Sequence, residues 1–195
     1  MSWEMDLADT LKKLRPADVN NGFDQSAVLV PIAFNPQSHT YEILLTKRTM
    51  LVESHKGQIS FPGGYAESTD SSLLNTATRE AQEEIGLHPN SVTILGALNP
   101  VQTSFAVTIY PYVGRVDLPY PFLLNGAEVE KMVFLPVSLL REKGLEEMSV
   151  NVGGVSVKSL GIWIEDDLIW GATAKILEEL RTFLLPLKLE GGSRG

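Results

Sequence analysis

The sequence predicts an α/β (α+β) fold in which a mixed β-sheet packs against helices. Apolar runs of strand length, separated by turn residues, recur between residues 26 and 170. A segment with helical periodicity, residues 71–85, follows the third of these runs and ends at Gly86. A second helical segment, residues 172–185, closes the pattern before Pro186.

Composition excludes several classes of protein. The 195 residues, 44% hydrophobic and 21% charged, suit one globular domain with a substantial core. A net charge of -8 disfavours nucleic-acid binding. The absence of cysteine excludes disulfides, zinc–thiolate sites and cysteine nucleophiles. No apolar run reaches the roughly 18 residues of a membrane span, and the acidic N-terminus is unlike a secretory signal, so a cytoplasmic location is expected.

Residues 1–20 are expected to form an N-terminal amphipathic helix or arm. Their apolar side chains stand at helical spacing, and Pro16 stops the run. Such a helix packs on its own domain or on the partner of a homodimer, and its acids disfavour a membrane role. Residues 21–190 are expected to form a single domain and residues 191–195 a disordered tail. The apolar positions of the helix are Trp3, Leu7, Leu11 and Leu14.

Strands and turns account for most of the remaining chain. Residues 26–34 and 41–48 are expected to form a hairpin, and Pro31 places the first strand at an edge or a bulge. Residues 58–61 form a short strand that leads into a turn at Gly63–Gly64, where the backbone can approach a ligand closely. The apolar, proline-rich loop 118–126 is expected to be a lid over a ligand site. Further strands are expected at residues 91–98, 107–116, 128–137, 160–164 and 168–170, with a hairpin turn at Gly153–Gly154.

The first long helix, with Ser71 as its predicted N-cap, carries the most informative charges. Because each residue advances about 100° around a helix, Glu80, Glu83 and Glu84 fall within one arc. Like charges three and four residues apart repel, so these carboxylates need a partner that the helix does not supply. A divalent cation, Mg²⁺ or Mn²⁺, suits such hard oxygen ligands. Arg79 can steer Glu83, and the alternative is a solvated acidic face.

Basic residues precede this region. Lys47 and Arg48 end a strand just before the loop that carries His55 and Lys56. There they could bind phosphate, although basic residues at strand ends are often only solvated. His55 could act as a base or contact a substrate, with a structural or surface role as the alternative.

The run REAQEEIG from Arg79 to Gly86, with Gly63–Gly64 upstream, resembles the Nudix box. That pattern is Gly, five residues, Glu, seven residues and then Arg-Glu-x-x-Glu-Glu-x-Gly. The second half matches completely. Counted from Gly64, the upstream acid position holds Asp70 in place of Glu, and eight residues separate it from Arg79.

The chain is similar in particular to the coenzyme A pyrophosphatase-like subfamily of Nudix hydrolases. The one-residue expansion after Asp70 is a feature of that subfamily. So are LLTKR at residues 44–48 and H-x-GQ-x-x-FPGG at residues 55–64, and WGATA at residues 170–174 is similar to a run near its C-terminus. Glu53 stands where the subfamily usually has arginine.

The resemblance implies a Nudix-type α/β/α sandwich and the hydrolysis of a nucleoside diphosphate linked to another group. It implies that Mg²⁺ or Mn²⁺ is held by Glu80, Glu83, Glu84 and the backbone carbonyl of Gly63. Glu83, with Arg79 beside it, is then expected to activate the attacking water.

Two alternatives for the base remain open, the loop 99–106 and Glu128. The expected partner is a small nucleotide, with no nucleic acid and no membrane. Substrate contacts are expected from Lys47, Arg48, His55, Lys56 and Gly64.

The favoured substrate is coenzyme A or a derivative, cleaved to 3′,5′-ADP and 4′-phosphopantetheine. The alternative is a Nudix hydrolase of ADP-ribose or of a dinucleotide such as NADH. A non-catalytic Nudix-fold binding module is a third hypothesis, and the intact acids of the box argue against it.

Overall fold

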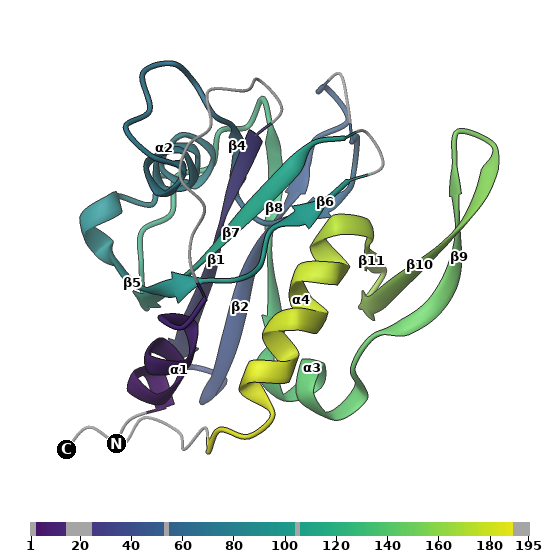
Figure 1. Cartoon of the computed structure of the whole chain (residues 1–195). Coiled ribbons are helices and arrows are strands. Elements are labelled where there is room, and N and C mark those ends of the chain that lie inside the picture. Colours follow the sequence, from purple (N-terminus) through teal and green to yellow (C-terminus); the bar gives the residue numbers. More distant parts are fainter. Residues whose placement is uncertain (1–2, 15–24, 53–54, 104–105, 189–195) are drawn as a thin grey trace.

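The computed structural model describes residues 3–14, 25–52, 55–103 and 106–188. Its main sheet has eight strands in the order β3-β2-β1-β7-β5, with β4 paired to β1, β6 to β7 and β8 to β2. The pair β1–β7 is parallel and the others are antiparallel, so the predicted mixed sheet is confirmed (Figure 1). The strands are β1 (Gln25–Asn35), β2 (Thr40–Arg48), β3 (Ile59–Ser60), β4 (Gly63–Tyr65), β5 (Val92–Ala97), β6 (Val101–Gln102), β7 (Thr108–Asp117) and β8 (Val129–Pro136).

A second, three-stranded antiparallel sheet lies beside the main one, in the order β11-β10-β9 (Figure 1). Its hairpin turns at Gly153–Gly154, as the sequence predicted. The hairpin is longer than predicted, because β10 begins at Val155 and not at residue 160. The strands are β9 (Glu146–Val152), β10 (Val155–Ile164) and β11 (Asp167–Trp170).

Helices cover both faces of the main sheet, which confirms the α/β/α sandwich (Figure 1). Strand β1 is buried on both faces because its successive side chains alternate between them. Ala27 and Leu29 pack in the cluster that holds α2, whereas Val28 and Val30 pack in the cluster that holds α1 and α4. The helices are α1 (Trp3–Leu11), α2 (Leu73–Ile85), the 3₁₀ turn η1 (Pro89–Ser91), α3 (Val137–Lys143) and α4 (Gly171–Leu184).

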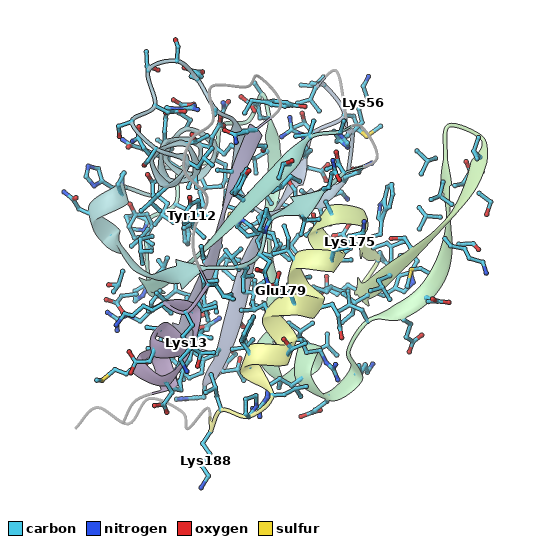
Figure 2. The ribbon with its side chains drawn as sticks, viewed as in Figure 1. Lys13, Lys56, Tyr112, Lys175, Glu179 and Lys188 are labelled. Atoms are coloured by element: carbon cyan, nitrogen blue, oxygen red, sulfur yellow. The ribbon has the colours of Figure 1, made fainter. Side chains whose placement is uncertain are left out.

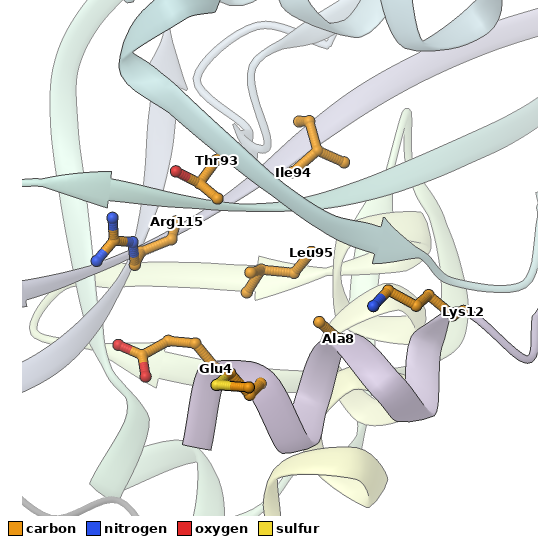
Figure 3. A pocket seen from close by; sticks show the side chains of 8 residues that line it. Glu4, Ala8, Lys12, Thr93, Ile94, Leu95 and Arg115 are labelled. Carbon is orange, nitrogen blue, oxygen red and sulfur yellow. The ribbon is translucent and has the colours of Figure 1, made fainter. Parts of the chain in front are cut away.

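Helix α1 packs against its own domain, on β5. It ends at Leu11, earlier than predicted, and Pro16 lies outside the described residues. Gly96 of β5 permits the contact, because a Cβ there would collide with the Leu11 side chain. Figure 3 shows a hollow between α1 and β5, bordered by the labelled side chains of Glu4 and Arg115, among others. In the described part of the chain, no helix has the length and apolarity needed to cross a membrane.

Helix α2 has a defined cap at each end. The Oγ of Ser72 accepts a hydrogen bond of 3.0 Å from the backbone N–H of Asn75, so Ser72 is the N-cap and the predicted Ser71 is wrong by one residue. At the other end Gly86 adopts a left-handed conformation with φ 68°, which glycine reaches without steric cost. Its N–H donates to the carbonyl of Gln82 at 3.0 Å. The helix end is thereby fixed directly after the acidic residues.

Pro31 lies in an inner strand, so the prediction that it marks an edge or a bulge is wrong. Strand β1 pairs with β7 on one side throughout its length. On the other side it pairs with β4 up to Val28 and with β2 from Ile32 onward. Pro31 stands in the gap between these two partners, where a missing backbone N–H leaves no ladder hydrogen bond unmade.

The predicted lid is fixed against the end of α2. The backbone N–H of Leu123 donates to the Ile85 carbonyl at 3.0 Å, and the N–H of Asn125 donates to the Glu84 carbonyl at 2.9 Å. The hydroxyl of Tyr120 donates to the Gly86 carbonyl at 3.0 Å and accepts from the His88 N–H at 2.9 Å. This segment therefore satisfies backbone groups that the helix leaves unpaired.

We expect Tyr120→Phe to lower the free energy of unfolding by about 1 to 2 kcal/mol, because both hydrogen bonds of the hydroxyl are lost. Urea denaturation measures the change. Tyr65→Phe is the matched control, since the Tyr65 side chain is largely exposed. Equal midpoints for the two variants would contradict the anchoring role of Tyr120.

Candidate active site

The candidate site lies where strand β4 meets helix α2. A Cβ on Gly64 would collide with the carboxylate of Glu80, and one on Gly63 would collide with the backbone of Ala27 and Val28. Both glycines belong to β4, so the turn predicted at this point is wrong. The backbone here approaches Glu80 and β1 closely, which the absence of side chains at these two positions permits. The predicted approach to a ligand stays a prediction.

Arg79 donates hydrogen bonds to three acidic side chains, and a fourth, Glu67, lies 3.8 Å from its Nη1. Its Nε and Nη2 donate to the two oxygens of Asp70 at 3.0 and 3.1 Å, which is a bidentate pair. Its Nη1 donates to Glu80 Oε1 at 3.0 Å and to Glu83 Oε2 at 3.1 Å. The hydrogen bond from Arg79 is the main cause that holds the pKa of Asp70 at about 2. Asp70 therefore fixes the guanidinium that steers Glu83, and the helix supplies part of the counter-charge that its acids need.

Glu84 is the buried acid of the site, with a side chain only 3% exposed. Arg48 Nη1 lies 3.4 Å from its Oε1, and Oε2 has no hydrogen-bond partner among the described residues. Burial raises the pKa of Glu84 to about 8, since Arg48 and the nearby backbone N–H of Gly63 offset the loss of water only in part. The neighbouring carboxylates of Glu80 and Glu128 raise this pKa further. Glu84 thus lacks a full counter-charge.

The two basic residues at the end of β2 lie on opposite faces of the main sheet, because side chains alternate along a strand, and Arg48 is on the face that α2 covers. The pairing with β8 shifts register at this point, where β8 carries one extra residue between the partners of Lys47 and Arg48. Arg48 reaches Glu84, and its Nη2 lies 4.0 Å from Glu128 Oε2. Lys47 Nζ instead lies 2.9 Å from Asp167 Oδ1 at the start of β11.

The Lys47 ammonium therefore helps to attach the small sheet to the main one. Asp167, with a side chain only 11% exposed, also accepts an ion pair of 2.8 Å from Lys131 of β8. The hydrogen bond with Asp167 raises the pKa of Lys47. The predicted phosphate contact by Lys47 thus competes with an ion pair already made in the fold.

The remaining predicted residues lie on exposed loops. His55 adopts φ 56°, and its Nδ1 lies 2.9 Å from Gln58 Oε1. Lys56 is exposed beside it (Figure 2). Asn99 opens the 99–106 loop, and its backbone N–H donates to Glu179 Oε1 of α4 at 3.0 Å. These contacts place no base from the described part of that loop against Glu83.

The acidic set fits a hard divalent cation. Glu84 presents a buried carboxylate oxygen without a hydrogen-bond partner, Glu80 and Glu128 add negative charge beside it, and the glycine backbone of β4 lies close. In the described ranges, no three acidic, histidine or cysteine side chains stand in a ready ligand geometry. In this structure Arg79 pairs with Glu80, and Arg48 pairs with Glu84. A bound cation would replace these arginine contacts.

The sequence alone did not indicate two of these contacts. Asp70 as the bidentate partner of Arg79 follows only from the path of the loop before α2. The pair Arg48–Glu84 joins residues on different elements, and a single sequence does not show which residue of α2 faces the end of β2.

Comparison with known proteins gives consistent matches. A family model described as NUDIX domain matches residues 24–150. The chain is 35% identical over 171 residues to a Nudix hydrolase named NudL of Yersinia enterocolitica, which covers 87% of this chain and 86% of the relative. It is 36% identical over 157 residues to NudL of Salmonella paratyphi B, covering 80% of each. The crystal structure of a MutT/nudix family protein from Enterococcus faecalis matches with a TM-score of 0.53 at 12% identity. The match covers 90% of this chain and 67% of the Enterococcus faecalis chain, so the two proteins share a fold.

The pKa of Glu84 predicts how stability depends on pH in metal-free buffer with EDTA. Its folded-state pKa of about 8 lies above the ordinary value of 4.5, so the native state keeps a proton that the unfolded chain releases between these values. The retained proton stabilises the native state at low pH, and this stabilisation is lost as pH rises toward 8.

The glutamine of Glu84→Gln cannot titrate, so the variant does not lose this stabilisation as pH rises. Its free energy of unfolding, compared with that of the wild type, should therefore increase by a few kcal/mol from pH 5 to pH 8. A tenfold change in proton affinity corresponds to about 1.4 kcal/mol. Chemical denaturation of both proteins across this range measures the difference. Parallel stability curves would contradict the raised pKa.

Proposed function

The chain belongs to the Nudix family, and from this premise we propose that it hydrolyses coenzyme A or a derivative in a divalent-metal-dependent reaction. As a Nudix hydrolase it is a pyrophosphohydrolase that acts on nucleoside diphosphate derivatives. The proposed products are 3′,5′-ADP and 4′-phosphopantetheine. The proposal has two parts, the use of the acidic site and the choice of substrate, and different observations support each part.

The observation that supports the acidic site best is the unpaired oxygen of Glu84. A buried carboxylate without a full counter-charge is costly, and such groups are found where a protein binds cations or performs chemistry. Glu80 lies next to it, and the β4 backbone approaches as closely as glycine allows. A merely solvated acidic face would not bury Glu84.

We assign cation binding to Glu80, Glu83, Glu84 and the carbonyl of Gly63. When bound, a cation would neutralise pyrophosphate oxygens and make water a better nucleophile near neutral pH. In this assignment Glu83 accepts the proton of the attacking water. Its carboxylate is suited to this role because it is 58% exposed, and Arg79 fixes it at 3.1 Å.

The water oxygen forms the new bond to phosphorus, and the P–O bond of the bridging oxygen breaks. The bridging oxygen leaves on the second phosphate. Arg79 is the positioning residue for Glu83, with Asp70 holding its other side. Arg48, once released from Glu84, is placed to contact a phosphate.

The resemblance in sequence supports coenzyme A as the substrate. LLTKR, the H-x-GQ-x-x-FPGG run and the expansion after Asp70 match the subfamily. Because Lys47 is paired with Asp167, we assign the 3′-phosphate contact first to Lys56, which is exposed on the loop before β3. Glu53, the departure from the subfamily, lies outside the described residues.

We expect Glu83→Gln to lower kcat by about a hundredfold or more, the usual contribution of a general base, while the melting temperature stays near that of the wild type. The fold should persist because the side chain is more than half exposed. Glu142→Gln, the same change on the exposed surface of α3, is the control. Full activity of the wild type in excess EDTA would refute metal dependence, and a larger loss in Glu128→Gln would move the base to Glu128.

The substrate prediction compares kcat/KM for coenzyme A, 3′-dephospho-coenzyme A and ADP-ribose, with mass spectrometry of the products. Coenzyme A should be the best of the three. If ADP-ribose is best, the assignment fails and the ADP-ribose alternative replaces it. If none is cleaved but one binds, the chain is a binding module.

A matched pair of lysine variants tests the 3′-phosphate contact within the same panel. Lys56→Gln should lower kcat/KM for coenzyme A and leave that for the dephospho form unchanged, because only the former carries the phosphate. Lys13→Gln, far from Lys56 in Figure 2, should change neither. An equal loss for both substrates in Lys56→Gln would remove Lys56 from the 3′-phosphate site.

A further inference from the structure

The β9–β10 hairpin stands away from the rest of the molecule (Figure 1). Its inner end is attached, since β10 pairs with β11 from Gly161 onward and packs on α4. Its outer end is not, and a Cβ at Gly153 or Gly154 would meet nothing within 4 Å. A two-stranded hairpin alone is marginally stable in water, so an outer half of this length needs a covering surface.

One face of this hairpin is mostly apolar, with Glu146 and Ser159 as its polar residues. The antiparallel register pairs Val152 with Val155 and Val150 with Val157. Because side chains alternate across a strand, these four valines lie on the same face. Met148 lies on that face too, as its sulfur would be 2.6 Å from a Cβ on Gly161.

The apolar face continues onto β11. Trp163 is six residues after Val157, an even number, so it lies on the same face, where it pairs with Leu168 of β11. We call this set the valine face; its members are Met148, Val150, Val152, Val155, Val157, Trp163, Leu168 and Trp170.

The opposite face of the hairpin has a different composition at each end. At the outer end it carries Ser149, Asn151, Ser156 and Lys158. At the inner end the same face carries Ile162 and Ile169, which are buried in the core with α4. The inner residues explain how the sheet is attached. The valine face therefore points away from that core.

The valine face is strongly exposed in the single chain. The exposed fractions are 39% for Val152, 63% for Val155, 42% for Val157 and 57% for Trp163. A contiguous apolar patch with strict alternation against a polar face is typical of a sheet that packs on another surface. Scattered single exposed residues would not produce this alternation.

We propose that the valine face is covered by the valine face of a second copy of this chain, in a two-fold dimer. A symmetric interface must be self-complementary, and a flat apolar sheet face is complementary to itself. Two such faces pack about 10 Å apart with their strands nearly aligned.

The charge distribution permits a second copy on this face, although the net charge of -8 makes two copies repel each other wherever their acids meet. Within the valine face the charged residue is Glu146, at its inner end, and Lys158 and Glu147 lie on the other side of the strands. This face therefore lets two acidic chains approach without bringing carboxylates together. An anionic lipid surface would repel the chain as a whole.

The size of the face limits the strength of such a dimer. At the usual rise per residue β10 is about 33 Å long, and the sheet is two strands, or about 10 Å, wide over most of that length, because β9 pairs with β10 up to Gly161 and β11 pairs with it from Gly161 onward. The face thus covers roughly 300 Å², less than the roughly 800 Å² that each partner buries in a stable complex, so the dimer should dissociate on dilution.

The test is the mass of the full chain in solution, measured by light scattering during gel filtration across a dilution series. At the concentrated end of the series the wild type should have about twice the 21.4 kDa mass of one chain. Val157→Lys should be monomeric, because the two-fold axis brings two unpaired ammonium groups into the apolar interface. Ser156→Lys places the same charge on the opposite face of the same strand and should remain dimeric.

Trp163 supplies a second readout. Acrylamide should quench tryptophan fluorescence more strongly in Val157→Lys than in the wild type or in Ser156→Lys, since Trp3 is buried in every form. Circular dichroism and the melting temperature check the fold. If Val157→Lys does not fold, Val155→Lys at the more exposed tip replaces it.

Three results would overturn the proposal. One is a single-chain mass for the wild type at every concentration. Another is an equal loss of dimer in Val157→Lys and Ser156→Lys. The third is that the wild type sediments with phosphatidylcholine vesicles and Val157→Lys does not. A lipid surface would then be the occupant of the valine face.

Discussion

The close packing of strand β4 against its neighbours depends on the absence of side chains at residues 63 and 64. A Cβ on Gly63 would collide with the backbone of β1, and one on Gly64 would collide with the carboxylate of Glu80 on α2. The Glu80 side chain therefore lies directly against β4. Glu84, one helical turn further on, is buried. The electrostatics of the site follow from this packing constraint.

Two arginines then share the acids between them, and neither neutralises the whole set. Arg79 is fully engaged by Asp70, Glu80 and Glu83, while Arg48 reaches Glu84 only at 3.4 Å. Partial neutralisation keeps the fold stable without a ligand and leaves a carboxylate oxygen that still requires one. A site with complete ion pairs would be more stable in isolation and would bind a cation less readily.

The fold was largely predictable because its signals are local. Alternating and helical periodicity located the strands and α2, and glycine marked where α2 ends. The predictions that were wrong concerned contacts between residues distant in sequence. Pro31 is tolerated in an inner strand because β2 and β4 leave a gap beside it, and no local pattern reveals such a gap. In the site, the acids were found by spacing, whereas the pairing of Arg48 with Glu84 depends on where α2 lies relative to the end of β2.

Alternation along β2 explains why two adjacent basic residues have different surroundings. Lys47 and Arg48 point to opposite faces of the main sheet. Arg48 faces α2 and Glu84, while Lys47 and Lys131 of β8 hold Asp167 of the small sheet. The small sheet is thus attached to the same strand end that contributes to the acidic site. Since this attachment is at its inner end, the outer hairpin can project while the strand beneath the site stays fixed.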